Sequence, residues 1–130
     1  MDETAGPLRV AVLLSGSGRT LDNLLRWIAE GRVYARVVAV ASNRAGVRGL
    51  EIADAAGIPT AVFRKSAHPD TTARDHAMWD FVHEHDADLV VLAGYLALLD
   101  LEPSRGIPVI NIHPSLLPHH GGDGYYGDRV

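Results

Sequence analysis

Residues 8–20 read LRVAVLLSGSGRT: an apolar run, a glycine-rich turn and the polar start of another segment. The run at 8–14 is apolar throughout, which is typical of a strand buried on both faces. Thr20 offers an N-cap to a helix that ends at Gly31. The apolar positions of this helix recur at helical spacing: Leu21, Leu24, Leu25 and Ile28. This strand–turn–helix unit predicts an α/β fold.

The same alternation continues along the chain. Further strands are predicted at 36–42, 60–63, 89–93 and 109–112, and further helices at 48–56 and 72–84. We expect Met78, Trp79 and Val82 to form the buried stripe of the last helix, and the acidic side chains of the helices to face solvent. The fold class is therefore α/β: a Rossmann-like, open, mostly parallel sheet with helices on both faces. The whole chain, 1–130, is one domain length.

Composition narrows the classes of function. The net charge is −4 and no basic block is present, which argues against nucleic acid and anionic membrane as partners. Cysteine is absent, so disulfides and thiolate chemistry are excluded and a cytoplasmic location is expected. No apolar stretch reaches the roughly 20 residues that span a bilayer.

The turn at 15–19 is a candidate anion site, because backbone N–H groups and a helix N-terminus converge there and Arg19 adds positive charge. The alternative is a tight turn that only requires glycine. A dinucleotide fingerprint fails, since Leu21 stands where a third glycine belongs and Ser42 is not followed by an acidic residue. A Walker motif fails as well. A small monophosphate suits the loop better than NAD or ATP.

Asn111 and His113 form the second candidate site. Along one strand they point to the same face, and Pro114 ends the strand there. An amide and an imidazole at the carboxyl end of a strand can hydrogen-bond and protonate a developing oxyanion. The alternative is a structural histidine beside a turn-forming asparagine. The other histidines lack metal-ligand spacing, so no metal is expected. Residues 114–130 are glycine-rich and aperiodic, and are interpreted as an active-site loop, with a disordered segment as the alternative.

Taken in order, these segments resemble the glycinamide ribonucleotide formyltransferases. The resemblance rests on four stretches: 10–21 (VAVLLSGSGRTL), 42–45 (SNRA), 88–96 (DLVVLAGYL) and 111–118 (NIHPSLLP). It covers nearly the whole chain from residue 8 onward. The last stretch is shared with relatives that formylate other amines, whereas the SGSG turn favours the purine enzyme.

The resemblance implies formyl transfer from 10-formyltetrahydrofolate, as co-substrate, to the amine of glycinamide ribonucleotide in purine synthesis. His113 and Asn111 would be catalytic, and no metal is implied. A homodimer is compatible with it. The substrate phosphate would be bound by Gly18, Arg19 and Thr20, and the folate by Leu96, Ala97, Leu98, Leu99 and Asn111.

Family members are about half as long again, and their catalytic aspartate lies beyond Val130. We therefore expect the 130-residue chain alone, as the N-terminal two-thirds of a formyltransferase domain, to have little or no activity. Two other functions stay open: a non-catalytic phosphate- or nucleotide-binding domain, and a formyltransferase acting on another amine. An NAD(P)-dependent oxidoreductase is disfavoured by the absent fingerprint.

Overall fold

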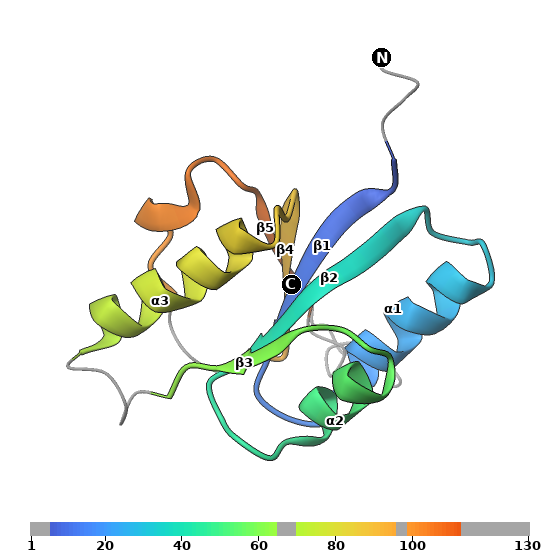
Figure 1. The fold of residues 1–130 in the computed structure, drawn as a ribbon, viewed down its shortest axis with the longest axis horizontal. Helices are drawn as coiled ribbons and strands as arrows, with labels where there is room; N and C mark the ends of the chain where they lie inside the picture. Colours follow the sequence, from blue (N-terminus) through green and yellow to red (C-terminus); the bar gives the residue numbers. More distant parts are fainter. Residues whose placement is uncertain (1–5, 65–69, 96–98, 113–130) are drawn as a thin grey trace, which may run out of the picture.

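The computed structural model describes residues 6–64, 70–95 and 99–112. Five parallel strands form one sheet in the order β3-β2-β1-β4-β5 (Figure 1). Their bounds are β1 Leu8–Leu14, β2 Ala35–Ser42, β3 Thr60–Val62, β4 Leu89–Ala93 and β5 Val109–Ile112. Every predicted strand is present, and each bound lies within one residue of the prediction.

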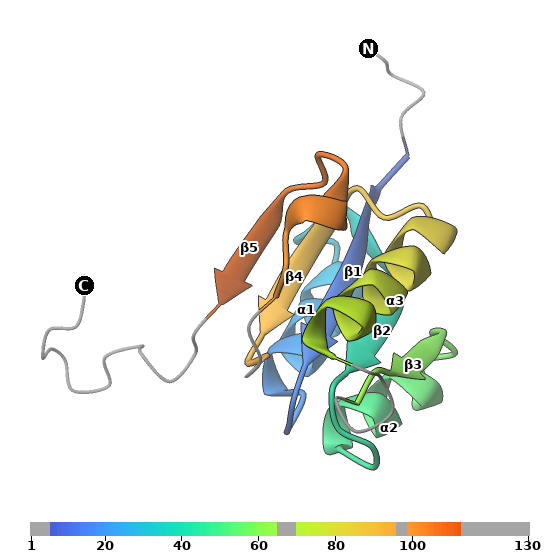
Figure 2. The same cartoon turned by 90° about the vertical axis from the view of Figure 1, so that its left-hand side faces the viewer.

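Helices cover both faces of this sheet (Figure 2). They are α1 Arg19–Ala29, α2 Arg48–Ala55 and α3 Thr71–Glu84, with a short 3-10 helix, η2 Glu102–Ser104, between β4 and β5. The helices α1 and α2 pack on one face and α3 packs on the other. The predicted Rossmann-like fold is confirmed, and η2 is the one element among the described residues that the sequence pattern did not indicate.

The core consists of two apolar layers separated by the sheet. One layer packs Leu21 of α1 and Leu50 of α2 against alternate residues of β1, β2 and β4. The other packs Met78, Trp79 and Val82 of α3, all less than 2% exposed, against the remaining residues of those strands. This is the stripe predicted for α3. Burying each large apolar side chain stabilises the fold by about 1.5–3 kcal/mol.

The start of α1 differs from the prediction. Thr20 is not the N-cap: the cap residue is Gly18, whose φ is 75°, and the helix begins at Arg19. The first helical bond joins Asp22 N to Gly18 O at 2.8 Å. The physical reason is the close packing of Gly18 on α2, which leaves no space for a side chain at the cap position.

One acidic helix residue also differs from the prediction. Asp75 of α3 does not face solvent; it is 3% exposed and lies beside Arg74, which is 4% exposed. By contrast, Asp70 is the N-cap of α3, and its side chain accepts a hydrogen bond from Ala73 N at 2.8 Å. Within the described part of the chain, none of the helices has the length and apolar character that crossing a membrane requires.

Candidate functional site

The carboxyl ends of the five parallel strands lie along one edge of the sheet, where the loops after β1 and β4 are neighbours. From β1 the chain winds outward through β2 to β3, then returns to form β4 and β5 on the other side of β1. The order therefore reverses between β1 and β4. Open α/β sheets bind their ligands in the crevice at such a reversal.

The loop after β1 has a shape that only glycine permits. Gly18 has φ 75°, and a Cβ there would lie 2.5 Å from the Cα of Gly49 in the first turn of α2. Gly49 in turn packs on Leu14, at the end of β1, so a Cβ at Gly49 would lie 2.6 Å from that side chain. The two glycines let the N-termini of α1 and α2 approach the same loop.

Hydrogen bonds fix this loop to α2 and to the residue that follows β2. Gly49 N donates to Gly16 O at 3.1 Å, and Ser15 Oγ donates to Asn43 Oδ1 at 2.6 Å. Ser15 is 1% exposed. The loop is thus held from both sides before any ligand arrives, which lowers the entropic cost of binding.

Arg19 and Thr20 lie in the first turn of α1, where the sequence pattern placed the anion site. Arg19 is exposed, and Arg19 N contacts Ser17 Oγ at 3.4 Å. The N-cap residue Gly18 makes no side-chain hydrogen bond, and Ser17 Oγ accepts from Arg19 N alone among the first-turn N–H groups of this described helix. The first-turn N–H groups and the positive end of the helix dipole therefore offer partners for an anion.

Asn111 lies in the edge strand β5, opposite Leu92 of β4. Ile110 and Ile112 point to the α1 side, so alternation places Asn111 on the α3 side of the sheet. Ile112 and Thr20 border the same apolar groove of about 420 Å³. The end of β5 and the start of α1 are thereby brought together. His113 and residues 114–130 lie outside the described residues.

The loop after β4 contains the predicted folate contacts. Leu99 is half-buried and packs with Tyr95 against the α3 layer of the core, while Leu96, Ala97 and Leu98 lie outside the described residues. Burial raises the pKa of the Tyr95 phenol; nearby Arg74 partly offsets this, and Asp75 adds to it. The Tyr95 phenol therefore keeps its proton at physiological pH.

Sequence reasoning missed a buried polar cluster beneath this loop. Arg74 Nη2 lies 2.9 Å from Asp75 Oδ1, and Asp75 Oδ2 accepts from Asp100 N at 2.8 Å. Trp79 Nε1 donates to Asp100 O at 2.8 Å. The signal was available: Asp75 stands three and four residues before Met78 and Trp79, on the face already assigned to the core.

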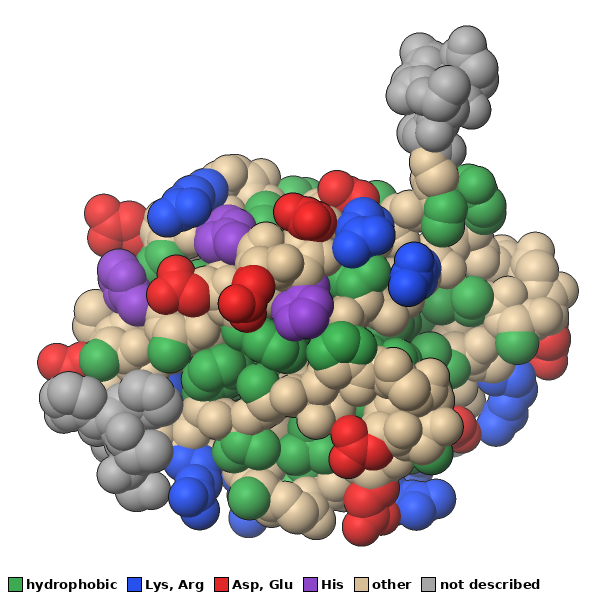
Figure 3. Space-filling view, in the orientation of Figure 1, with side chains coloured by type: hydrophobic (Ala, Val, Ile, Leu, Met, Phe, Trp, Pro, Cys, Tyr) green, Lys and Arg blue, Asp and Glu red, His purple; other side chains and the backbone are tan. Residues whose placement is uncertain are grey.

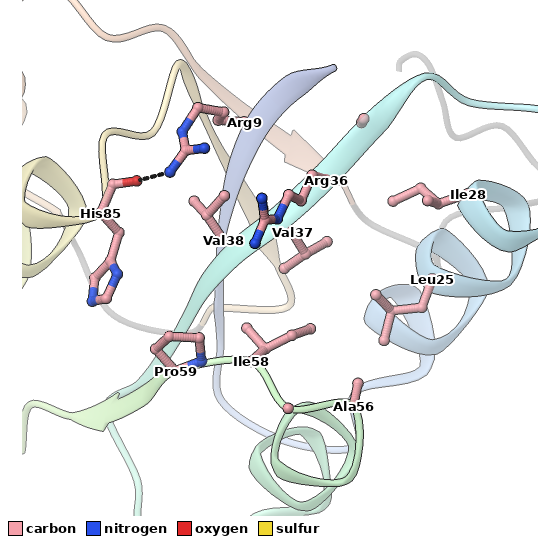
Figure 4. A pocket seen from close by; sticks show the side chains of 12 residues that line it. Arg9, Leu25, Ile28, Arg36, Val37, Val38, Ala56, Ile58, Pro59 and His85 are labelled. Carbon is pink, nitrogen blue, oxygen red and sulfur yellow. Dashed lines mark hydrogen bonds between the residues drawn. The ribbon is translucent and has the colours of Figure 1, made fainter. Parts of the chain in front are cut away.

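A hollow of about 410 Å³ lies at the opposite edge, near the amino ends of β1 and β2 (Figure 4). Arg9 and His85 line it, but the Arg9 guanidinium is already held by His85 O and Asp86 O, both at 2.9 Å. Since α/β ligands bind at the carboxyl edge, we do not assign a substrate to this hollow.

One face of the molecule carries no large patch of a single charge among its coloured residues (Figure 3). Figure 3 shows acidic, basic, histidine and apolar side chains interspersed among the coloured residues of one face. Within the described ranges, His, Asp and Glu side chains do not gather in threes that could hold a metal ion.

Comparison with known proteins identifies the family. Residues 8–127 match the model of the formyl transferase family. The chain is 36% identical over 116 residues to the phosphoribosylglycinamide formyltransferase of Haemophilus influenzae, covering 88% of this chain and 55% of that protein.

The solved structures that resemble this chain include two with different printed activities. Glycinamide ribonucleotide transformylase 1 from Symbiobacterium toebii has a TM-score of 0.77 and 40% identity, over 89% of this chain and 56% of that one. A formyltetrahydrofolate deformylase from Pseudomonas putida has a TM-score of 0.74 and 29% identity. The match covers 87% of this chain and 40% of that one. This chain spans about half the length of these single-function relatives. The chain belongs to the formyl transferase family.

Proposed function

We propose that the protein transfers a formyl group from 10-formyltetrahydrofolate to the amine of glycinamide ribonucleotide. The observation that carries this proposal is the geometry of the loop at 15–20, which is shaped by Gly18, leads into a helix N-terminus and lies at the point where the strand order reverses. Thr20, at its end, borders the same groove as Ile112. The substrate is a phosphate monoester, and the loop supplies the partners that such a group needs.

In this proposal the phosphate is bound by Gly18 and Thr20 through the N–H groups at the start of α1, and by the Arg19 guanidinium. The helix has 11 residues, enough for a developed dipole. The bound phosphate then fixes the position of the amine. Binding energy from this non-reacting group is thereby used to orient the reacting atoms, which lowers the activation barrier.

Asn111 and His113 act on the formyl group. The substrate amine attacks the formyl carbon, and its electron pair forms the new C–N bond while negative charge moves to the formyl oxygen. Asn111 Nδ2 donates to that oxygen and protonated His113 stabilises the charge. The bond to the folate nitrogen then breaks, that nitrogen receives a proton, and the amine loses one. Atoms and charge balance without a metal.

The folate is proposed to contact Leu96, Ala97, Leu98, Leu99 and Asn111. Support comes from the position of Leu99 and Tyr95, in the loop after β4, on the α3 side of the sheet where alternation also places Asn111. We further propose a cytoplasmic location, consistent with the absence of cysteine. Homodimer formation and the role of 114–130 as an active-site loop remain predictions.

A transfer assay tests the proposal. The purified protein, expressed from its complete reading frame, is incubated with 10-formyltetrahydrofolate and glycinamide ribonucleotide, and mass spectrometry follows formylated product and free formate. Formylated product without matching formate supports the proposal. Formate alone would indicate hydrolysis, the reaction named for the Pseudomonas putida relative, and binding of both ligands without turnover would indicate a non-catalytic domain.

A further inference from the structure

Three side chains of α3 hold the backbone of the β4–β5 connection. Asp75, Trp79 and His83 stand four residues apart, so they form one stripe along the helix. The first two bind the same residue from both sides: Asp75 Oδ2 accepts from Asp100 N, and Trp79 Nε1 donates to Asp100 O, each at 2.8 Å. His83 Nε2 lies 2.9 Å from Pro103 O.

Burying the Arg74–Asp75 ion pair costs free energy. Asp75 and Arg74 are both almost fully buried. The free energy lost by desolvating two such charges is commonly as large as the free energy gained from their attraction. A pair of apolar residues would pack this position at similar or greater stability. What an apolar pair could not do is bind the main chain of Asp100. The charged pair therefore contributes geometry that packing alone does not provide.

Asp100 follows directly on Leu99, which together with Asn111 is one of the two described members of the proposed folate contacts. Leu99 and Tyr95 pack on the same core layer as Trp79. Asp100 Oδ1 also accepts from Glu102 N at 3.0 Å, and this bond stabilises the turn that begins at Asp100. The hydrogen bonds from α3 to Asp100 thus fix the position of the neighbouring Leu99.

We propose that Asp75 and Trp79 are positioning residues for the folate: they act through Asp100 to hold the chain that contacts it. This inference rests on the proposed function. The phosphate loop is built separately, from α1, α2 and the end of β1 on the other face of the sheet. Loosening Asp100 therefore weakens folate binding and leaves phosphate binding unchanged.

Steady-state kinetics of Trp79→Phe and Asp75→Asn test the inference. Each substitution removes or weakens one bond to Asp100, so the KM for 10-formyltetrahydrofolate rises roughly tenfold. The KM for glycinamide ribonucleotide stays within about twofold, because no contact to the phosphate loop changes. Asp80→Asn, the same substitution on the exposed side of α3, is the matched control and leaves both constants unchanged.

Two readouts do not depend on turnover. Isothermal titration calorimetry gives the Kd for 10-formyltetrahydrofolate, which rises in Trp79→Phe and not in Asp80→Asn. Trp27→Phe leaves Trp79 as the sole tryptophan within residues 1–130, and any tryptophan outside this range is replaced by Phe as well. In that background, Asp75→Asn shifts the Trp79 emission to longer wavelength as Asp100 is released, and Asp80→Asn does not. Trp79→Phe keeps a buried aromatic ring and serves where Asp75→Asn fails to fold.

The outcomes separate this inference from the proposed function. A selective rise in the folate constants supports the inference. If the wild-type protein transfers formyl groups but the variants change both KM values equally, or neither, the positioning role is wrong and the function stands. If the wild-type protein neither turns over nor binds 10-formyltetrahydrofolate, both are overturned.

Discussion

Gly18 at the start of α1 lies in direct backbone contact with Gly49 in the first turn of α2. A Cβ on Gly18 would come within 2.5 Å of the Gly49 Cα, and the φ of 75° at Gly18 is itself unfavourable for other residues. The loop between β1 and α1 is therefore fixed by a close approach of two helices. The proposed binding of an anion there depends on that approach, because it brings the N–H groups of α1 to the reversal point of the sheet.

Gly18→Ala is expected to destabilise the fold by about 3 kcal/mol, from a left-handed backbone and overpacking against Gly49. Gly16→Ala is the matched control, since no atom lies within 4 Å of its added Cβ and its φ is not positive. Urea unfolding measures both. Equal midpoints for the two variants would show that the close approach is not a constraint.

Asp75→Asn is expected to lower the free energy of unfolding by about 3 kcal/mol, because the buried ion pair between Asp75 and Arg74 is lost. Asp80→Asn should change it by less than about 0.5 kcal/mol. In a double-mutant cycle, Arg74→Met combined with Asp75→Asn should be less destabilising than the sum of the single variants. Additive effects in chemical denaturation would refute the coupling.

The raised pKa of Tyr95 predicts that the folded protein loses stability at alkaline pH. Burial raises its pKa in the folded state, so the unfolded chain loses the phenolic proton first, near pH 10. Stability is complete below that pH and falls as pH rises above it, by up to about 1.4 kcal/mol per unit.

The difference in unfolding free energy between wild type and Tyr95→Phe, measured from pH 9 to 11, should reveal this loss. Tyr34→Phe, at a tyrosine that is 74% exposed, is the control and should keep the wild-type dependence. A Tyr95→Phe curve parallel to that of wild type would exclude the contribution of Tyr95.

Asn111→Ala is expected to lower kcat by roughly 100- to 1,000-fold, the usual effect of removing one donor to a developing oxyanion. Its side chain is exposed on an edge strand, so stability should change little. Ile110→Thr, one residue earlier and on the opposite face, should retain most of the activity. Comparable losses in both variants would point to disruption of β5 instead of a role in the reaction.

The sequence predicted the arrangement of elements because the signals there are local. Apolar runs such as Leu89–Ala93 mark strands buried on both faces, and the glycines that follow helices mark their ends. The crossover rule then leaves few topologies. The same reasoning located the anion loop and the end of β5 as candidate sites.

Features that depend on contacts distant in sequence were not predictable in the same way. Gly18 replaces Thr20 as the cap of α1 because of Gly49, which lies 31 positions later in the chain. Asp75 is buried because Asp100 N, 25 residues away, needs an acceptor. The wrong environment for Asp75 came from its residue type and not from periodicity, since an acidic residue on a helix is usually solvated.

The central claim is that the loop at 15–20 binds the phosphate of a formyl acceptor. The most direct test is the ratio of kcat/KM for glycinamide ribonucleotide to that for the same compound without its phosphate, in wild type and in Arg19→Ala. We predict that wild type favours the phosphorylated acceptor by at least about 100-fold and that Arg19→Ala loses roughly tenfold of this preference. Equal kcat/KM values for the two acceptors in wild type would contradict the claim.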